Sequence, residues 1–66
     1  MSKKRYWLIA ERVRNEMTQN EAAKKIGISQ PTLSLIEKGD HLPQVSTAMK
    51  IGSTLGFDFM RFYQEE

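Results

Sequence analysis

Residues 18–39 read TQNEAAKKIGISQPTLSLIEKG, and this stretch decides the fold. It opens on a capping box, in which the Thr18 hydroxyl can accept a hydrogen bond from the Glu21 N–H while the Glu21 carboxylate reaches back to the Thr18 N–H. A helix that begins at Gln19 is expected to end at Gly27, because glycine readily adopts the left-handed conformation that terminates helices.

A second helix is expected to follow at once. Ser29 is a favourable N-cap, Pro31 is tolerated in the first turn, and Gly39 is expected to end the helix. Ala23 is small enough to let the two helices cross closely. The apolar residues expected to wedge them together are Ile26, Ile28, Leu33 and Ile36. We therefore predict a helix-turn-helix over residues 19–38.

The flanking sequence also predicts helices. Apolar spacing of i, i+4, i+7 and i+11 indicates one stripe of a first helix, formed by Tyr6, Ala10, Val13 and Met17 and widened by Leu8 and Ile9. A fourth helix is expected between Pro43 and Gly56, with an inward face of Val45, Ala48, Met49, Ile51, Gly52 and Leu55. Asp58 is a suitable N-cap for a short fifth helix. Strand patterns are absent, so the predicted fold is all-α, with five short helices in one domain that spans residues 1–66.

Composition excludes several kinds of site. The chain has no cysteine and one histidine, His41, so disulfides, thiolate zinc sites and histidine clusters are ruled out. The sequence offers no paired general acid and base and no nucleophile with a base, and we expect neither an enzyme nor a cofactor. No apolar run approaches the ~18 residues that a membrane span needs. These features favour a cytoplasmic protein.

Charge is distributed unevenly along the chain. Residues 1–14 hold five basic residues and one acidic residue, a net charge of +4, whereas residues 15–66 have a net charge of −2. We interpret residues 1–5 as a basic arm that contacts phosphates or another anionic surface.

The outward side of the helix after Ser29 has an unusual composition for a surface helix. Pro31, Ser34, Leu35 and Lys38 lie at i, i+3, i+4 and i+7, with Gln30 beside them. Glutamine suits a bidentate contact with adenine, serine can meet either a donor or an acceptor, and an aliphatic tip suits the thymine methyl. This pattern predicts a helix that lies in the major groove of DNA. The expected base contacts are Gln30, Pro31, Ser34 and Leu35.

Together these residues resemble the lambda-repressor-like helix-turn-helix family, the Xre/Cro type of phage repressors and bacterial regulators. The matching segments are Thr18-Gln19, residues 22–30, residues 34–39, Pro43 and Leu55-Gly56. The resemblance implies that Gln19 contacts a DNA phosphate, that Gln30 contacts bases, and that Lys38 meets the sugar-phosphate backbone. With the basic arm, the predicted phosphate contacts are Gln19, Ser29, Lys38, Lys3, Lys4 and Arg5.

The resemblance also implies that Glu37 pairs with an arginine of the first helix. Two candidates are present. Counting back from Gln19 selects Arg12, but that register places Glu11 and Asn15 in the core. The apolar stripe selects Arg14 instead, and we predict an ion pair of Arg14 with Glu37, with Arg12 as the alternative.

The C-terminal aromatic residues allow two interpretations. Phe57, Phe59, Phe62 and Tyr63 lie within the last ten residues. They either close the core or contribute to a two-fold dimer contact. The family resemblance implies a weak or DNA-assisted homodimer that binds double-stranded DNA.

The sequence therefore predicts a sequence-specific transcriptional regulator, most consistent with a repressor that binds a palindromic operator as a dimer. The alternative is an antitoxin or anti-repressor that uses the same fold to bind a protein partner, such as a toxin or a repressor.

Overall fold

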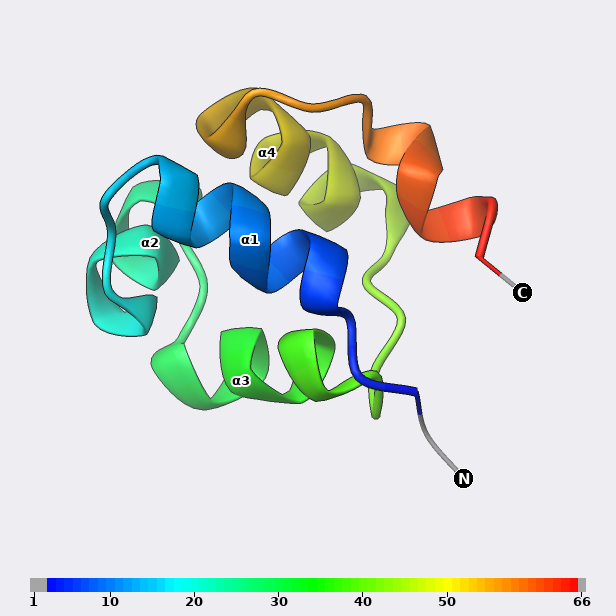
Figure 1. Cartoon of the computed structure of the whole chain (residues 1–66), viewed down its shortest axis with the longest axis horizontal. Coiled ribbons are helices and arrows are strands. Elements are labelled where there is room, and N and C mark those ends of the chain that lie inside the picture. The colour runs from blue at the N-terminus through cyan, green and yellow to red at the C-terminus, as the bar shows by residue number, and fades with distance from the viewer. Residues whose placement is uncertain (1–2, 66) are drawn as a thin grey trace.

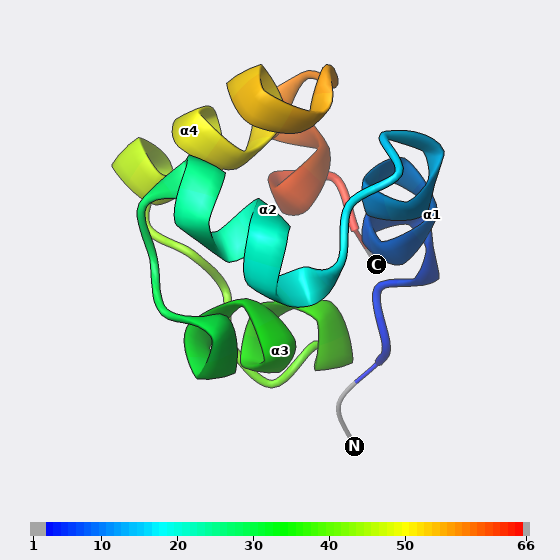
Figure 2. The same cartoon turned by 90° about the vertical axis from the view of Figure 1, so that its left-hand side faces the viewer.

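The computed structural model describes residues 3–65. Its elements are α1 (Tyr6–Arg14), α2 (Gln19–Ile26), α3 (Gln30–Lys38), α4 (Val45–Leu55) and a terminal 3-10 helix, η1 (Phe59–Tyr63). In Figure 1, α1 crosses the middle of the molecule with α4 above it and α3 below it. Figure 2 shows α2 between α4 and α3. The described residues contain helices and no strand, which confirms the predicted all-α class.

The local signals around the helix-turn-helix are confirmed. Both hydrogen bonds of the Thr18–Glu21 capping box are present, at 3.1 Å and 2.8 Å. The backbone and side-chain hydrogen bonds from Thr18 hold the pKa of Glu21 below its ordinary value. Gly27 adopts φ 92° and ends α2, while the Ser29 side chain accepts from the N–H of Thr32 and begins α3. These groups are neighbours in sequence, so the sequence alone predicts them.

The predicted fifth helix is a 3-10 helix rather than an α-helix. Asp58 is its N-cap, as expected, because its side chain accepts from the Met60 N–H. The element has only five residues, and 3-10 geometry occurs mostly in short helical pieces and at chain connections rather than in long helices.

The predicted apolar stripe of α1 is wrong for three residues, whereas Leu8 is buried and Met17 packs against the core as expected. Tyr6 is 71% exposed, Val13 is 59% exposed, and Ala10 is exposed as well. In place of those three residues the helix turns Glu11 inward, to 7% exposure. A buried carboxylate is tolerated here because arginine side chains satisfy it. Arg14 and Arg61 both donate to Glu11, which lets α1 turn an acidic residue inward.

In α4 the predicted inward face is correct for Ala48, Ile51, Gly52 and Leu55 and wrong for two residues, Val45 and Met49, which are exposed. Gly52 is required by a close approach of the chain. A Cβ at this position would lie 2.6 Å from the carbonyl oxygen of Phe57, since the segment after α4 folds back across the helix. This return brings η1 against α4.

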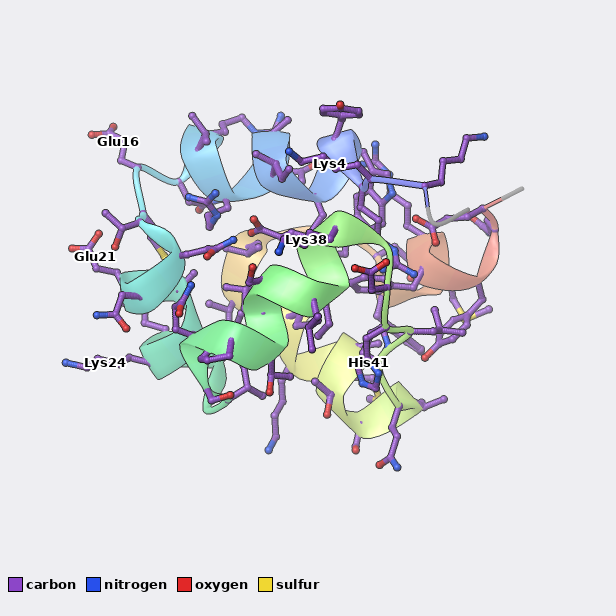
Figure 3. All side chains as sticks on the ribbon, turned by 90° about the horizontal axis from the view of Figure 1, so that it is seen from below. Lys4, Glu16, Glu21, Lys24, Lys38 and His41 are labelled. Atoms are coloured by element: carbon purple, nitrogen blue, oxygen red, sulfur yellow. The ribbon has the colours of Figure 1, made fainter. Side chains whose placement is uncertain are left out.

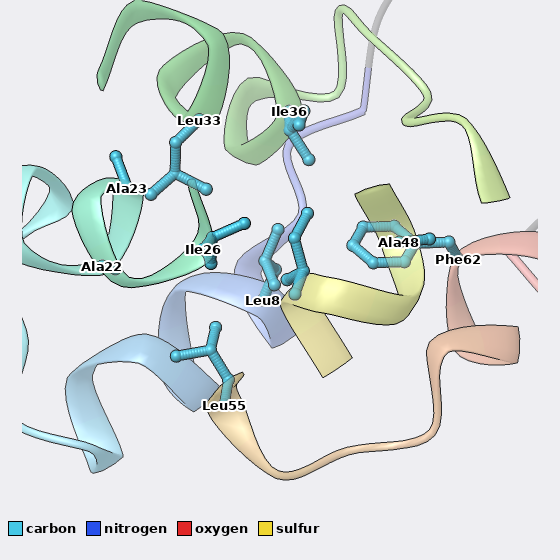
Figure 4. Close-up of a cluster of buried hydrophobic side chains, with 10 residues drawn as sticks. Leu8, Ala22, Ala23, Ile26, Leu33, Ile36, Ala48, Leu55 and Phe62 are labelled. Carbon is cyan, nitrogen blue, oxygen red and sulfur yellow. The ribbon is translucent and has the colours of Figure 1, made fainter. Parts of the chain in front are cut away.

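Figure 4 shows the core, to which every helix contributes. Its buried members are Leu8, Ala22, Ala23, Ile26, Leu33, Ile36, Ala48, Ile51, Leu55 and Phe62. Phe62 lies edge-on to Trp7, with ring centroids 5.1 Å apart, and packs beside Phe57. Phe57 and Phe59 are half-buried against this core. Phe62 thus closes the core, and Tyr63 stays partly exposed.

Candidate nucleic-acid interface

The outward face of α3 is directed away from the core, as predicted. Leu33 and Ile36 are buried on the inner side, whereas Pro31 and Lys38 are exposed and Leu35 is 46% exposed. Gln30 and Ser34 are half-buried beside them. Figure 3 looks onto this side, with α3 in front. We call Gln30, Pro31, Ser34, Leu35 and Lys38 the outer face of α3.

A hydrogen-bonded network lies at one edge of this face. The Gln30 amide nitrogen donates to Gln19 Oε1 at 2.6 Å, and the Gln19 amide nitrogen donates to Glu37 Oε1 at 2.8 Å. Arg12 donates to both Glu37 oxygens, at 2.7 Å and 3.3 Å, and to the carbonyl oxygen of Met17 at 2.9 Å. We call Gln30, Gln19, Glu37 and Arg12 the polar relay. It connects α1, α2 and α3 through side-chain hydrogen bonds.

The polar relay fixes the direction in which each amide points. The Glu37 carboxylate, as an ion pair with Arg12, only accepts hydrogen bonds. Gln19 therefore turns its NH2 group to Glu37 and its oxygen to Gln30, and Gln30 turns its NH2 group to Gln19. The polar relay uses neither the carbonyl oxygen nor the second N–H of Gln30. The hydrogen bond to Gln19 therefore holds the Gln30 amide while leaving it one acceptor and one donor outside the relay.

The predicted pairing of Glu37 with Arg14 is wrong, and the alternative, Arg12, is correct. Glu37 is 2% exposed and holds Arg12, whereas the Arg14 side chain is 70% exposed and reaches only Glu11. The register counted from Gln19 appeared unfavourable because it turned Glu11 inward. Burial of the Glu11 carboxylate is possible because Arg14 and Arg61 donate hydrogen bonds to it.

The predicted phosphate contact from Arg5 is contradicted. Arg5 is 6% exposed, and its Nη1 donates to the carbonyl oxygens of Ile36 and His41 at 2.6 Å and 2.9 Å. Its Nε donates to the Glu65 carboxylate at 2.9 Å. The guanidinium also lies 5.5 Å from the centroid of the Phe62 ring. The Arg5 guanidinium packs against the Phe62 ring and donates to acceptors within the protein, so it is not presented to a phosphate.

The other predicted phosphate residues have different surroundings. Lys3, Lys4 and Lys38 are exposed, and Figure 3 shows Lys4 and Lys38 on the same side of the molecule. Gln19 is half-buried within the polar relay at the start of α2. The Ser29 hydroxyl is exposed but caps α3 and bonds to Thr32 Oγ1 at 2.7 Å. Residues 1 and 2 of the predicted arm lie outside the described residues.

Comparison with known families identifies this arrangement. A family model described as helix-turn-helix, of the Xre and lambda-repressor type, matches residues 8–62, which include α2, α3 and the whole polar relay. The chain belongs to this helix-turn-helix family. Its members are DNA-binding regulators of transcription and the family is not enzymatic, so DNA-binding regulation of transcription is the activity that the family supports for this chain.

Two helix-turn-helix relatives illustrate the similarity. An uncharacterized HTH-type transcriptional regulator of Bacillus subtilis, YqaF, is 38% identical over 61 residues, which cover 92% of this chain and 80% of the relative. A second uncharacterized HTH-type transcriptional regulator, MJ0272 of Methanocaldococcus jannaschii, is 40% identical over 45 residues, or 68% of each chain. No solved structure gives a significant match.

The structure of this helix-turn-helix protein also bears on metal sites and on membrane-spanning helices. Within residues 3–65 no three histidine, aspartate or glutamate side chains gather where they could hold a metal ion. None of the helices in the described part of the chain has the length and apolar character needed to cross a membrane.

Sequence reasoning missed one group of residues in this helix-turn-helix protein. Glu65 accepts from Arg5 and also from the indole Nε1 of Trp7, at 2.8 Å. Arg5 and Glu65 are 60 residues apart in the chain, and no local pattern links them. Arg5 has an apolar setting because folding places the Phe62 ring beside it.

Proposed function

We propose that this chain represses transcription by occupying a two-fold symmetric operator as a dimer, with α3 in the major groove. The polar relay supports this proposal most directly. It gives Gln30 a preset donor and acceptor at the start of the exposed helix, and such preorganisation lowers the entropic cost of binding. In this proposal residues 1–66 form one DNA-binding domain without catalytic activity or cofactor. The protein acts in the cytoplasm, where its DNA target lies.

Bases are contacted by the outer face of α3. Gln30 offers its oxygen to the adenine N6 amino group and its second N–H to adenine N7, a bidentate arrangement specific to that base in the major groove. Leu35 supplies an apolar tip for a thymine methyl, and Ser34 can meet a donor or an acceptor. Pro31 makes van der Waals contact with the edge of the groove.

Phosphate contacts position this face on the duplex. Gln19 lies at the N-terminus of α2, where backbone N–H groups and the helix dipole favour an anion. Ser29 begins α3 in the same way. Lys38, Lys3 and Lys4 carry the positive charge at the opposite end of α3. Such contacts give affinity and orientation, whereas the bases give specificity.

A second copy of the chain is the partner that we assign to a group of exposed apolar side chains, which we call the dimer patch: Leu42, Val45, Met60 and Tyr63. The Tyr63 hydroxyl donates to the carbonyl oxygen of Pro43 at 3.0 Å, which ties η1 to the loop that follows α3. The Cα extents are 27 × 21 × 20 Å. Copies whose α3 helices lie ~34 Å apart, one DNA turn, meet through a small area, so we expect a dimer that forms on DNA.

The experiment that tests this proposal is selection of bound duplexes from a random library, followed by titration of the selected site at several salt concentrations. We expect a two-fold symmetric consensus. Because Lys and Arg contacts release counterions, log K should fall with log salt concentration by about 0.9 per neutralised phosphate. Failure to enrich any sequence, or binding indifferent to salt, would contradict the proposal and favour the antitoxin or anti-repressor alternative.

Replacing Gln30 with alanine is expected to weaken binding to the selected site by about 1–3 kcal/mol and to relax the preference at one base pair per half-site. The cause is loss of the bidentate contact that the polar relay orients. Quantitative titration against the selected duplex and its single-base variants measures both effects. Gln64→Ala, which alters an exposed glutamine beyond η1, is the matched control. An equal loss on random DNA would show that Gln30 does not contact bases.

A further inference from the structure

The segment Lys3–Arg5 is packed against the C-terminal end of α3. The backbone N–H of Arg5 donates to the carbonyl oxygen of Glu37 at 2.8 Å, and Arg5 Nη1 donates to that of Ile36 at 2.6 Å. The backbone of Lys3 lies so close to Gly39 that a Cβ there would overlap the Lys3 carbonyl group. Lys3 and Arg5 thus rest on the C-terminal end of α3, where carbonyl groups lack helical partners.

Residues at the other end of the chain hold Arg5 in this position. The Glu65 carboxylate accepts from Arg5 Nε through both oxygens, at 3.0 Å and 2.9 Å, and from Trp7 Nε1. The Arg5 side chain is 7% exposed and that of Glu65 29%, so this ion pair is largely shielded from solvent. We call Arg5, Glu65 and Trp7 the terminal clamp.

The terminal clamp determines where two lysines lie. With Arg5 fixed, Lys3 and Lys4 project from a segment held beside Gly39, next to Lys38. The Lys4 ammonium lies 5.6 Å from the centroid of the exposed Tyr6 ring, which further restricts its direction. Asp40 is the acidic residue of the adjoining loop and only partly offsets these three charges. The result is a lysine group at a fixed place beside the outer face of α3.

We propose that Arg5 and Glu65 are positioning residues for DNA binding, because the terminal clamp converts the basic N-terminal segment from a free arm into a fixed phosphate-binding element. This inference rests on the proposed function, and it assigns DNA contact to Lys3 and Lys4 but not to Arg5. A fixed lysine contributes without the entropic cost of ordering a mobile chain when DNA binds.

A double-mutant cycle on the selected duplex tests the proposal. Lys4→Ala is measured in the wild-type chain and in Glu65→Ala, each as affinity at several salt concentrations. In the wild-type chain, Lys4→Ala is expected to reduce the magnitude of the log–log salt slope by about 0.9, the loss of one phosphate contact. In the Glu65→Ala background the same substitution is expected to change the slope little, because the contact has already been lost.

Glu16→Ala is the matched control for Glu65→Ala. It removes the same charge from an exposed residue, which Figure 3 shows at the end of the molecule away from Lys4 and Lys38. Trp7 is the single tryptophan, so a change in its fluorescence in Glu65→Ala, but not in Glu16→Ala, reports that the clamp has opened. Arg5→Met is a second variant that opens the clamp and keeps an apolar side chain beside Phe62.

An equal effect of Lys4→Ala in the wild-type and opened-clamp backgrounds would overturn the clamp proposal. The proposal would also be overturned if Glu65→Ala changed the tryptophan fluorescence but bound DNA with the same affinity as Glu16→Ala. Absence of salt-dependent DNA binding by the wild-type chain would instead contradict the proposed function, so the two failures are distinguishable.

Discussion

Replacing Glu37 with alanine is expected to lower the free energy of unfolding by about 3 kcal/mol, because it leaves the guanidinium of Arg12 without its carboxylate in a mostly buried setting. The side chains of Arg12 and Glu37 are 15% and 3% exposed. For a domain of this size the melting temperature should fall by more than about 10 °C. Thermal and urea denaturation measure the loss, and Glu16→Ala is the exposed control.

Loss of DNA affinity should accompany the Glu37 substitution, since Gln19 and Gln30 lose the acceptor that orients them. The double variant Arg12→Met/Glu37→Leu separates the two effects. Replacing a buried ion pair by apolar residues is often neutral for stability. We therefore expect recovered melting but continued weak and less selective binding. Wild-type melting and affinity in Glu37→Ala would refute the structural importance of the polar relay.

Truncating Phe62 to alanine is expected to cost about 3–5 kcal/mol of folding free energy. Phe62 is 2% exposed, and its ring contacts Trp7 and Phe57 and lies beneath the Arg5 guanidinium. A 66-residue domain has a total stability of only about 3–10 kcal/mol, so a large fraction of the Phe62→Ala molecules should be unfolded at 37 °C. Circular dichroism during urea titration measures the change.

Tyr63→Ala serves as the neighbouring control for Phe62→Ala. Tyr63 is partly exposed, so its loss should change the folding free energy much less and should weaken cooperative occupation of two half-sites. If the two substitutions destabilised the monomer equally, the assignment of Phe62 to the core and Tyr63 to the dimer patch would be incorrect.

The polar relay runs from Gln30 at the N-terminus of α3 to Glu37 in its last turn, and the terminal clamp meets α3 at that last turn. The relay fixes Gln30 at its N-terminus through Gln19 of α2, whereas the clamp covers its C-terminal carbonyl groups through Arg5. Substitutions in the relay should therefore alter base preference, and substitutions in the clamp should alter the salt dependence. Base preference and salt dependence of DNA binding should therefore respond to different groups of residues in the free protein.

The helix-turn-helix could be predicted from the sequence because its boundaries depend on local hydrogen bonds. Thr18 and Glu21 are three residues apart, and Gly27 and Gly39 end α2 and α3 by adopting positive φ angles, which glycine does without strain. The apolar residues between them repeat at helical spacing. The outward position of Leu35 and Lys38 then follows from helix geometry alone.

Only the tertiary structure decided which arginine pairs with Glu37 and what Arg5 does. Apolar periodicity favoured Arg14, but the burial of Glu11 depends on Arg61, 50 residues away. Arg12 and Glu37 are 25 residues apart, and Arg5 and Glu65 are 60 residues apart. A charged side chain can be buried only where distant partners satisfy it, and those partners are brought together by the packing of α1, α3 and η1.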